Sequence, residues 1–510
     1  MSNLAGIIGI ETSSLKLYGV VAIGLILMYQ ATGIIYNLFF HPLRKYPGPL
    51  LHAASRLPYA IRHGSGTQAH HTQKLHDRYG PVVRIGPDHL SYTDTRAWKD
   101  IYGHRVGAES NTAEMPKART FNRILRHIPT SIINADREEH SRFRRALSHG
   151  FSDNAMREQE PIIRKYIDLL LERLHQECGN GKEKLNMEAW YNWTTFDIVG
   201  DLVFGQSFRC LESIHYHPWI EFIFTSIRFG AVLVGMTYLG LGDLVQLIAK
   251  SGSNVILRVR GYTDAMVKSR LGMEKDRDDL FEGLVKKRDE WNLSFQKLSS
   301  TAFILVLAGS ETTATTLSGA TYLLLTHPDI LAKLNHEVRS TFNSADEITI
   351  NTANKLSYML AILNESLRMY PPVTSGLVRE VPSGGAQVAG RFVAGGTFVE
   401  VQHWAMNHSD ENWKDPWVFR PERFLKSPEE AAEAGDKLEA LQAFNVGPRN
   451  CIGRNLAYAE MRMILARIVY DFDMKLADES QRWIERQKSF SLWERIPLYV
   501  QLTPIRRSSL

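Results

Sequence analysis

A short stretch near the end of the chain has residue types and a spacing that suit metal chemistry. It reads Phe444-Asn-Val-Gly447-Pro-Arg449-Asn-Cys451-Ile-Gly453. A thiolate that binds iron must be presented on a rigid turn, and the two glycines allow backbone angles and close approaches that a side chain forbids. The guanidinium of Arg449 suits an anionic partner such as a haem propionate. The stretch predicts a haem-thiolate loop with Cys451 as the iron ligand; a buried structural cysteine in a glycine turn is the alternative.

Another candidate lies in a long apolar segment, predicted to be a helix from about Leu298 to Leu325, which contains Ala308-Gly309-Ser310-Glu311-Thr312-Thr313. Burial of a lone carboxylate is costly, so a polar function is expected here. Gly309 would let a flat cofactor or dioxygen approach, and the Thr312 hydroxyl would compete for backbone carbonyls and open the helix locally. Glu311 and Thr312 are interpreted as a proton relay. Alternatively, the hydroxyls only satisfy backbone carbonyls.

These two segments resemble the cytochrome P-450 superfamily. The cysteine segment matches its haem-binding signature F-x-x-G-x-R-x-C-x-G at every specified position, and the apolar helix is similar to its oxygen-activating A-G-x-E-T-T helix. The resemblance implies haem b (iron protoporphyrin IX) as the cofactor. It also implies that the Cys451 thiolate is the proximal ligand, which favours O–O cleavage, and that Glu311 and Thr312 deliver protons. Phe444, Gly447, Arg449 and Gly453 would complete the haem-binding loop.

Charged residues in two later segments resemble the structural part of the same pattern. Glu365-Ser-Leu-Arg368 places an acid and a base on one face of a helix, and Pro421-Glu422-Arg423-Phe424 follows further along the chain. Alone, such a pair is an ordinary surface contact. In the family this order marks the E-x-x-R helix and the PERF segment, so the resemblance implies a buried network of Glu365, Arg368 and Arg423 that holds the haem-binding core.

Further basic residues are candidates for the haem propionates. His140 and Arg144 have helical i,i+4 spacing, in a segment that resembles the family's W-x-x-x-R helix with His140 in place of tryptophan. Arg145 is the alternative partner within this segment. Arg379 resembles another propionate ligand by position only.

The N-terminal segment is predicted to cross a membrane. From Leu17 to Phe40 the chain has no Asp, Glu, Lys, Arg or His, and a helix of this length spans about 36 Å, enough for the hydrocarbon core of a bilayer. Basic residues such as Arg44 and Lys45 gather after this segment, which places residues 1–16 in the lumen and the rest of the chain in the cytosol. A cleaved signal peptide is the alternative.

Beyond the anchor, residues 41–60 are predicted to be a proline-rich hinge, and residues 61–510 one catalytic domain, because no linker, repeat or low-complexity run divides them. Interleaved apolar residues, as from Met156 to Glu177, predict a mainly α fold with small β-sheets. The strand-like stretches are short, as at residues 82–85 and 499–502, and a C-terminal hairpin is expected around Ser489 to Leu502.

Composition excludes several classes of protein. The chain of 510 residues has three cysteines, at 178, 210 and 451, an odd number that argues against a disulfide framework. Its formal net charge of +5 is modest for this length and gives no support for nucleic-acid binding.

The resemblance implies a microsomal monooxygenase in the endoplasmic reticulum membrane, which oxidises a lipophilic small molecule with dioxygen. No G-x-G-x-x-G fingerprint is present, so electrons are expected from NADPH through a separate NADPH-cytochrome P-450 reductase. A haem-thiolate isomerase or dehydratase without a reductase, and a non-catalytic haem-binding membrane protein, are the alternatives.

Substrate-pocket residues are expected in four segments: residues 105–133, Trp219–Ala249, Val373–Leu377 and Ser489–Trp493. The apolar segment Trp219–Ala249 is predicted either to roof the pocket and dip into the bilayer or to form an ordinary core helix pair. The hinge and the Gln487–Trp493 ending are most similar to fungal enzymes of secondary metabolism, including isotrichodermin hydroxylase-like proteins. This likeness favours a terpenoid or polyketide substrate.

Overall fold

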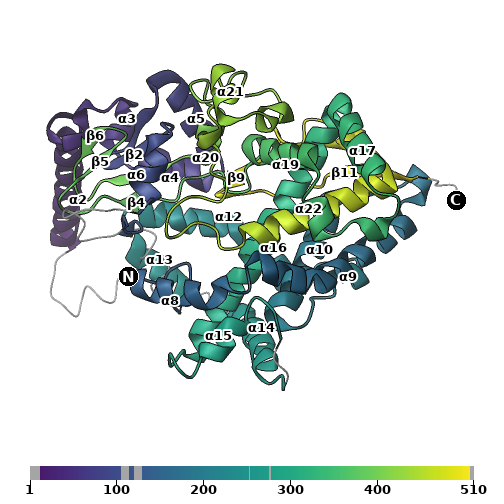
Figure 1. Ribbon diagram of the computed structural model, residues 1–510. Helices are drawn as coiled ribbons and strands as arrows, with labels where there is room; N and C mark the ends of the chain where they lie inside the picture. The colour runs from purple at the N-terminus through teal and green to yellow at the C-terminus, as the bar shows by residue number, and fades with distance from the viewer. Residues whose placement is uncertain (1–11, 105–113, 120–128, 252, 275–276, 506–510) are drawn as a thin grey trace.

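The computed structural model describes residues 12–104, 114–119, 129–251, 253–274 and 277–505. Helices dominate these residues, and the strands form small sheets (Figure 1). The helices are α2 (Thr12–Ile35), α3 (Leu50–Ala54), α4 (Leu57–Gly64), α5 (Gln68–Tyr79), α6 (Arg96–Tyr102), α8 (Arg137–Ser148), α9 (Asp153–Glu177), α10 (Met187–Phe204), α11 (Cys210–Ser213), α12 (Pro218–Tyr238), α13 (Gly242–Ser251), α14 (Ser253–Leu271), α15 (Glu282–Lys287), α16 (Phe295–Thr326), α17 (Pro328–Thr341), α18 (Ile350–Ala353), α19 (Ser357–Met369), α20 (His403–Asn407), α21 (Pro428–Glu433) and α22 (Arg454–Asp471). The strands are β1 (Val82–Gly86), β2 (His89–Tyr92), β3 (Lys184–Asn186), β4 (Arg379–Glu380), β5 (Ala386–Val388), β6 (Arg391–Val393), β7 (Phe398–Val401), β8 (Phe472–Leu476), β9 (Ser489–Phe490), β10 (Leu492–Trp493) and β11 (Tyr499–Pro504).

Helix α16 runs through the middle of the molecule. Its first turn is capped by Ser294, whose hydroxyl accepts from the Lys297 backbone N–H at 3.3 Å. It ends before Pro328, because a proline disfavours helical geometry in the residue that precedes it. Helix α16 packs against α10, α14, α19 and α22, so one long apolar helix connects the main parts of the core.

The largest sheet has the strand order β1-β2-β7-β4. Strands β1 and β2 form an antiparallel hairpin, β7 runs parallel to β2 with Ser91 opposite Glu400, and β4 closes the edge. This sheet lies on the same side of the molecule as α2, whereas α9, α17 and β11 lie at the other end (Figure 1).

The C-terminal strands differ from the predicted single hairpin. Strands β9 and β10 pair with each other, with Trp493 opposite Ser489. Strand β11 pairs instead with β8 and β3. The loop between β10 and β11 therefore bridges two sheets, and it carries Arg495 into the interior.

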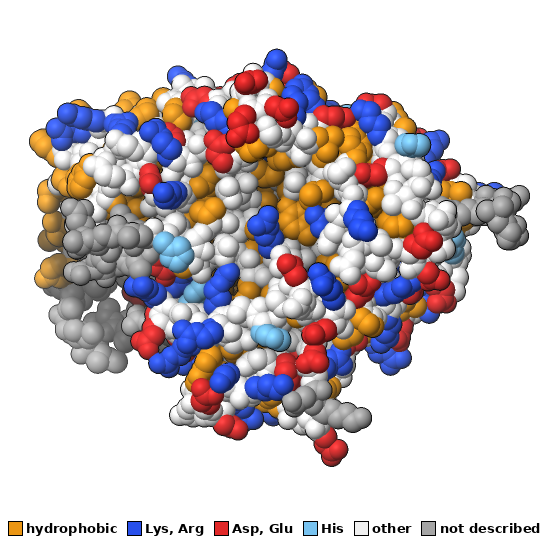
Figure 2. Space-filling model, in the orientation of Figure 1, with side chains coloured by type: hydrophobic (Ala, Val, Ile, Leu, Met, Phe, Trp, Pro, Cys, Tyr) orange, Lys and Arg blue, Asp and Glu red, His pale blue; other side chains and the backbone are white. Residues whose placement is uncertain are grey.

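Two helices are long and apolar enough to cross a membrane, by length and composition only, among the described residues. The first spans Lys16–Phe40 and has no buried residues in its most apolar window. The second is α12, which is partly buried and packs against α4. Figure 2 shows apolar side chains along the left edge of the molecule, where α2 lies in Figure 1.

Candidate active site

A cavity of about 220 Å³ separates the cysteine loop from α16. Cys451 lies on one wall, and Gly309 and Thr312 lie on the other. The remaining lining is mostly apolar and comprises Ile132, Ile133, Arg144, Phe151, Val199, Leu280, Ile304, Leu305, Ala308, Thr313, Phe444, Asn450, Ile452, Gly453, Leu456 and Ala457. The fold thus brings the two most chemically informative segments of the sequence face to face.

The cysteine loop is a closed turn. The Cys451 backbone N–H donates to the Phe444 carbonyl at 2.8 Å, and the Asn450 N–H donates to the Gly447 carbonyl at 3.1 Å. The sulfur is accessible from the cavity although the loop lies inside the protein. Burial raises the pKa of the Cys451 thiol, while the Gly453 N–H and the Arg144 guanidinium act in the opposite direction. The loop therefore presents a single sulfur to the cavity.

The two glycines of the loop have different roles. Gly447 has φ +78°, and a Cβ at this position would overlap the Tyr102 carbonyl. Gly453 has φ −85°, which any residue can adopt, and precedes the first residue of α22. A Cβ at Gly453 would lie 3.9 Å from the Cys451 sulfur. The backbone therefore requires glycine at 447, whereas a larger residue at 453 would place its side chain beside the Cys451 sulfur.

Thr312 and Gly309 line the cavity, but α16 stays continuous there. The Thr312 hydroxyl donates to the Ala308 carbonyl at 2.7 Å, four residues back, without breaking the helix. A Cβ at Gly309 would lie 3.2 Å from Val199 on α10. The absent side chain thus makes room for α10, while Gly309 also lines the cavity, as expected for a residue that lets a ligand approach. Local opening of the helix at Thr312, also expected from the sequence, is not seen here.

Glu311 points away from the cavity lining into a buried ion cluster. Its carboxylate accepts from Arg495, which also donates to Asn192 and lies 3.2 Å from the Glu188 carboxylate. The Arg495 guanidinium also stacks on the Phe224 ring of α12, 3.2 Å from the ring centroid. The predicted relay pair is therefore divided, with Thr312 at the cavity and Glu311 held by Arg495.

Basic side chains gather behind the cysteine loop. His140, Arg379, Arg449 and Lys117 are electrostatically coupled there, and Glu114 pairs with Arg449 at 2.8 Å. Burial and the nearby Arg449 lower the pKa of His140 to about 3 and that of Lys117 to about 7. Although His140 is neutral at pH 7 and Glu114 pairs with Arg449, Arg379 and Lys117 leave a net positive charge that suits an anionic group. Haem fits these residues, because its propionates would meet the cations while its apolar ring occupies the slot beside Cys451.

Arg144, and not its neighbour Arg145, lines the cavity. Its guanidinium donates to the Asn450 carbonyl at 2.7 Å and to the Asn450 side chain. Arg145 is exposed. The Arg144 guanidinium therefore connects α8 to Asn450, the residue that precedes Cys451 in the loop.

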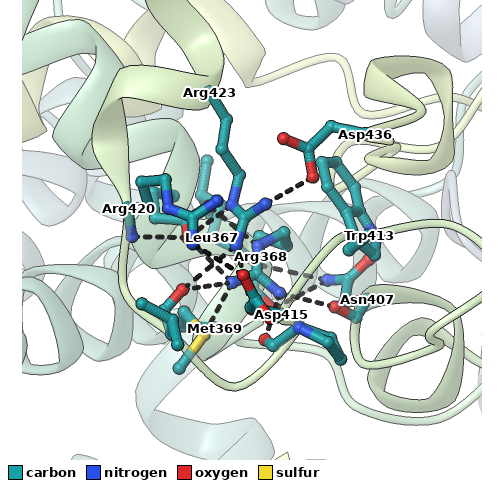
Figure 3. A network of polar contacts seen from close by, with 12 residues as sticks. Leu367, Arg368, Met369, Asn407, Trp413, Asp415, Arg420, Arg423 and Asp436 are labelled. Atoms are coloured by element: carbon teal, nitrogen blue, oxygen red, sulfur yellow. Dashed lines mark hydrogen bonds and ion pairs between the residues drawn. The ribbon is translucent and has the colours of Figure 1, made fainter. Parts of the chain in front are cut away.

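The charge network expected around Glu365 is fully buried. Figure 3 shows Arg368, Arg423 and Asp436 within it. Arg368 makes two hydrogen bonds to the Glu365 carboxylate, at 2.7 and 2.8 Å, and Arg423 lies 3.3 Å from it. Arg423 also pairs with Asp436. Two Arg368 bonds, to the Asn407 and Pro416 carbonyls at 2.7 Å each, fasten the segment that leads to the cysteine loop.

Several residues of the site were not found from the sequence. Asp436, Arg495, Glu188, Lys117 and Glu114 all lie in segments without a motif, and nothing in their spacing indicated a role. Part of the segment 105–133, expected to line the substrate pocket, lies outside the described residues. In the described part, Ile132 and Ile133 line the cavity.

Comparison with known proteins agrees with this geometry. Residues 51–501 match the family described as Cytochrome P-450. The chain is 48% identical over 492 residues to the cytochrome P-450 monooxygenase tpeC of Talaromyces stipitatus, covering 96% of each chain. It is 42% identical over 490 residues to the trichothecene C-15 hydroxylase of Fusarium sporotrichioides, covering 94% of this chain and 96% of that one. The identity is also 42% over 490 residues to the averantin hydroxylase of Dothistroma septosporum, covering 95% and 91%. The chain therefore belongs to the cytochrome P-450 family and is a haem-dependent monooxygenase.

Proposed function

We propose that this monooxygenase hydroxylates a lipophilic terpenoid or polyketide in fungal secondary metabolism, using electrons from NADPH delivered by a membrane-bound reductase. The observation that carries the proposal is the apolar cavity with Cys451 and Thr312 on opposite walls. Haem, when bound at Cys451, supplies the activation of dioxygen. The chain's own residues bind the cofactor, exclude water from the apolar slot and deliver protons.

Thr312 is the proposed final proton donor, because its hydroxyl belongs to a residue of α16 that lines the cavity opposite Cys451, at the position that resembles the family's oxygen-activating threonine. The proton must be replaced after each turnover. Glu311 is adjacent in sequence but is held by Arg495. Proton transfer from Glu311 to the Thr312 oxygen therefore requires the carboxylate to leave Arg495 or to pass its proton through water.

The relatives support the substrate class. Two of them are named as hydroxylases, of a trichothecene and of averantin. Helix α12 is apolar, lies over α4 and reaches the Arg495 cluster through Phe224. This arrangement supports its role as the pocket roof, through which a lipophilic substrate enters from the bilayer.

Membrane anchoring supports the electron partner. The span Lys16–Phe40 would hold the catalytic domain at the cytosolic face of the endoplasmic reticulum, where a reductase anchored in the same membrane would reach it. Residues 1–11, assigned to the lumen from the sequence, lie outside the described residues.

Reconstitution with NADPH and a reductase tests the proposal. The dithionite-reduced protein should show a strongly red-shifted Soret band with carbon monoxide, which Cys451→Ser abolishes. With a lipophilic terpenoid or polyketide, product should form only when NADPH and the reductase are both present. Product without a reductase would indicate an isomerase or dehydratase. No NADPH consumption with any substrate of these classes would indicate a non-catalytic haem protein.

A further inference from the structure

A separate cavity, of about 370 Å³, opens at the surface where α4, α5 and the β9 region meet. Its lining comprises Arg62, Gly66, Thr67, His70, His71, Lys74, Glu485, Gln487 and Lys488. The Ser489 backbone N–H donates to the Gly66 carbonyl at 2.9 Å, and the Phe490 ring packs on Gly66. The cavity thus has a rigid floor made from two segments that are far apart in the sequence.

The charges around this cavity do not balance. Arg62, Lys74 and Lys488 are exposed, and none of them forms an ion pair with a residue that the structure describes. Glu485 supplies the one carboxylate of the lining. Burial and the nearby His52, Arg62 and Lys74 lower the pKa of His71 to about 4. Three cations therefore face one acid, and an anion would be attracted to the cavity.

An exposed apolar surface begins directly beside these cations. On α4, Leu57 and Ile61 are 50% and 58% exposed, and on α12, Phe229 and Val232 are 57% and 44% exposed. A Cβ at Gly64 would lie 3.7 Å from Val232, so the two helices form one continuous face. A surface of this kind, rimmed by polar groups, marks an interaction site.

The same face continues to the membrane anchor. Leu50 and Leu51 on α3 are each 75% exposed. The Asn37 side chain, just before the end of the apolar span, donates to the Ala54 carbonyl at 3.0 Å. The apolar residues of α3 and α4 therefore lie next to the point where the chain leaves the bilayer, and the cationic cavity lies at their rim.

We propose that the cavity lined by Arg62, Lys74 and Lys488 binds the phosphate head group of an anionic phospholipid, whose acyl chains lie along the exposed apolar residues of α4 and α12. The cations match the head-group charge, and the apolar face matches the chains. Membrane surfaces that carry anionic lipids attract Lys and Arg in this way. The proposal rests on the proposed membrane anchoring and goes beyond the monooxygenase activity, because it assigns a lipid site outside the haem cavity.

The test compares lipid retention by the full-length, haem-loaded protein in neutral detergent micelles. Native mass spectrometry counts phosphatidylserine and phosphatidylcholine molecules bound to the wild type and to the double variant Lys74→Gln with Lys488→Gln. The matched control is Lys182→Gln with Lys475→Gln, which removes two exposed cations next to η3 (Gly179–Gly181) and in β8. Because each cation is expected to contribute about fivefold, the cavity variant should lose about 25-fold in phosphatidylserine affinity.

The proposal requires that the control variant and the wild type retain phosphatidylserine equally, and that phosphatidylcholine retention is the same in all three proteins. An equal loss in the control would show that diffuse charge attracts the lipid, which overturns the site. Displacement of the lipid by millimolar inorganic phosphate would indicate a free-anion site and also overturns it. Ile61→Ser should weaken phosphatidylserine retention as well, since the acyl chains need the apolar face. None of these readouts uses catalysis, so a negative result leaves the proposed activity untouched.

Discussion

Two buried clusters of charge hold the core together, and they differ in balance. Around Glu365, two guanidiniums, Arg368 and Arg423, meet two carboxylates, Glu365 and Asp436. Around Arg495, one guanidinium meets two carboxylates, Glu188 and Glu311. The first cluster can be fully ionised with no net charge, whereas the second has one carboxylate too many for its cation.

The imbalance gives the Arg495 cluster a titratable proton. Burial raises the pKa of Glu188 to about 7, despite the opposing attraction of Arg495 and with a further contribution from Glu311. The Glu365 network is therefore suited to a fixed structural role, and the Arg495 cluster to holding a proton beside the helix that carries Thr312. The comparison predicts that one buried ion network serves stability and the other proton storage, according to the ratio of acids to bases.

Removal of Glu365 should cause the largest loss of stability. Glu365→Ala leaves the Arg368 guanidinium without its carboxylate, and an arginine cannot lose its proton to relieve the cost. We expect a loss of about 3–5 kcal/mol in the free energy of unfolding, with little dependence on pH. Thermal unfolding of the haem-loaded protein measures the loss. As a control, Glu138→Ala breaks an exposed pair with Arg142 and should cost less than about 0.5 kcal/mol; comparable losses would contradict the structural assignment.

Removal of Arg495 should lower the free energy of unfolding by a smaller amount, and this loss should depend on pH. Arg495→Gln leaves Glu188 and Glu311 without a cation, but carboxyl groups can take up protons and become neutral. We expect a loss of about 3 kcal/mol above pH 7 that shrinks as the pH falls. Chemical denaturation at several pH values measures the dependence. The exposed Arg145→Gln serves as a control. A pH-independent loss would show that the Arg495 cluster takes up no proton and is a fixed ionic network like the one around Glu365.

Thr312→Ala tests whether the threonine hydroxyl at the cavity serves catalysis. We expect product formation to fall about 10²-fold while NADPH is still consumed and hydrogen peroxide is released, because the cavity loses its hydroxyl donor. The matched control is Thr316→Ala, whose hydroxyl likewise donates to a carbonyl four residues back, at 2.9 Å, but does not line the cavity. Equal product yields from the wild type and Thr312→Ala would remove Thr312 from the relay.

Glu188→Gln should change the free energy of unfolding least, and the change should appear only in how stability depends on pH. The pKa of this carboxyl is 4.5 in its ordinary state and about 7 in the fold, so the native state holds a proton in this window that the unfolded chain has released. The stability of the wild type should therefore fall as the pH rises from 4.5 to 7. We expect the variant to lose about 2 kcal/mol of that change. Melting temperatures across this range provide the measurement, and parallel pH profiles would rule out the stored proton.

Local geometry explains which features were predictable. The helix at 298–325 and the strands at 82–85 and 499–502 lie within the observed α16, β1 and β11, because hydrophobic periodicity and capping act over a few residues. The pairing of Glu365 with Arg368 follows in the same way from their helical spacing. The predicted C-terminal hairpin is present but shorter, because β9 and β10 pair with each other while β11 pairs with β8 and β3, which lie elsewhere in the chain.

The sequence by itself determined the family, the cysteine loop, the glycine turn at 447 and the apolar N-terminal helix, because each depends on residues that are neighbours along the chain. Only the tertiary structure decided where Glu311 points, since its partner Arg495 is 184 positions away. The same holds for Asp436 beside Arg423, for Gly309 against Val199 and for Arg62, Lys74 and Lys488 around one surface cavity. A buried charge takes whichever partner the packing brings within reach, and no local pattern encodes that choice.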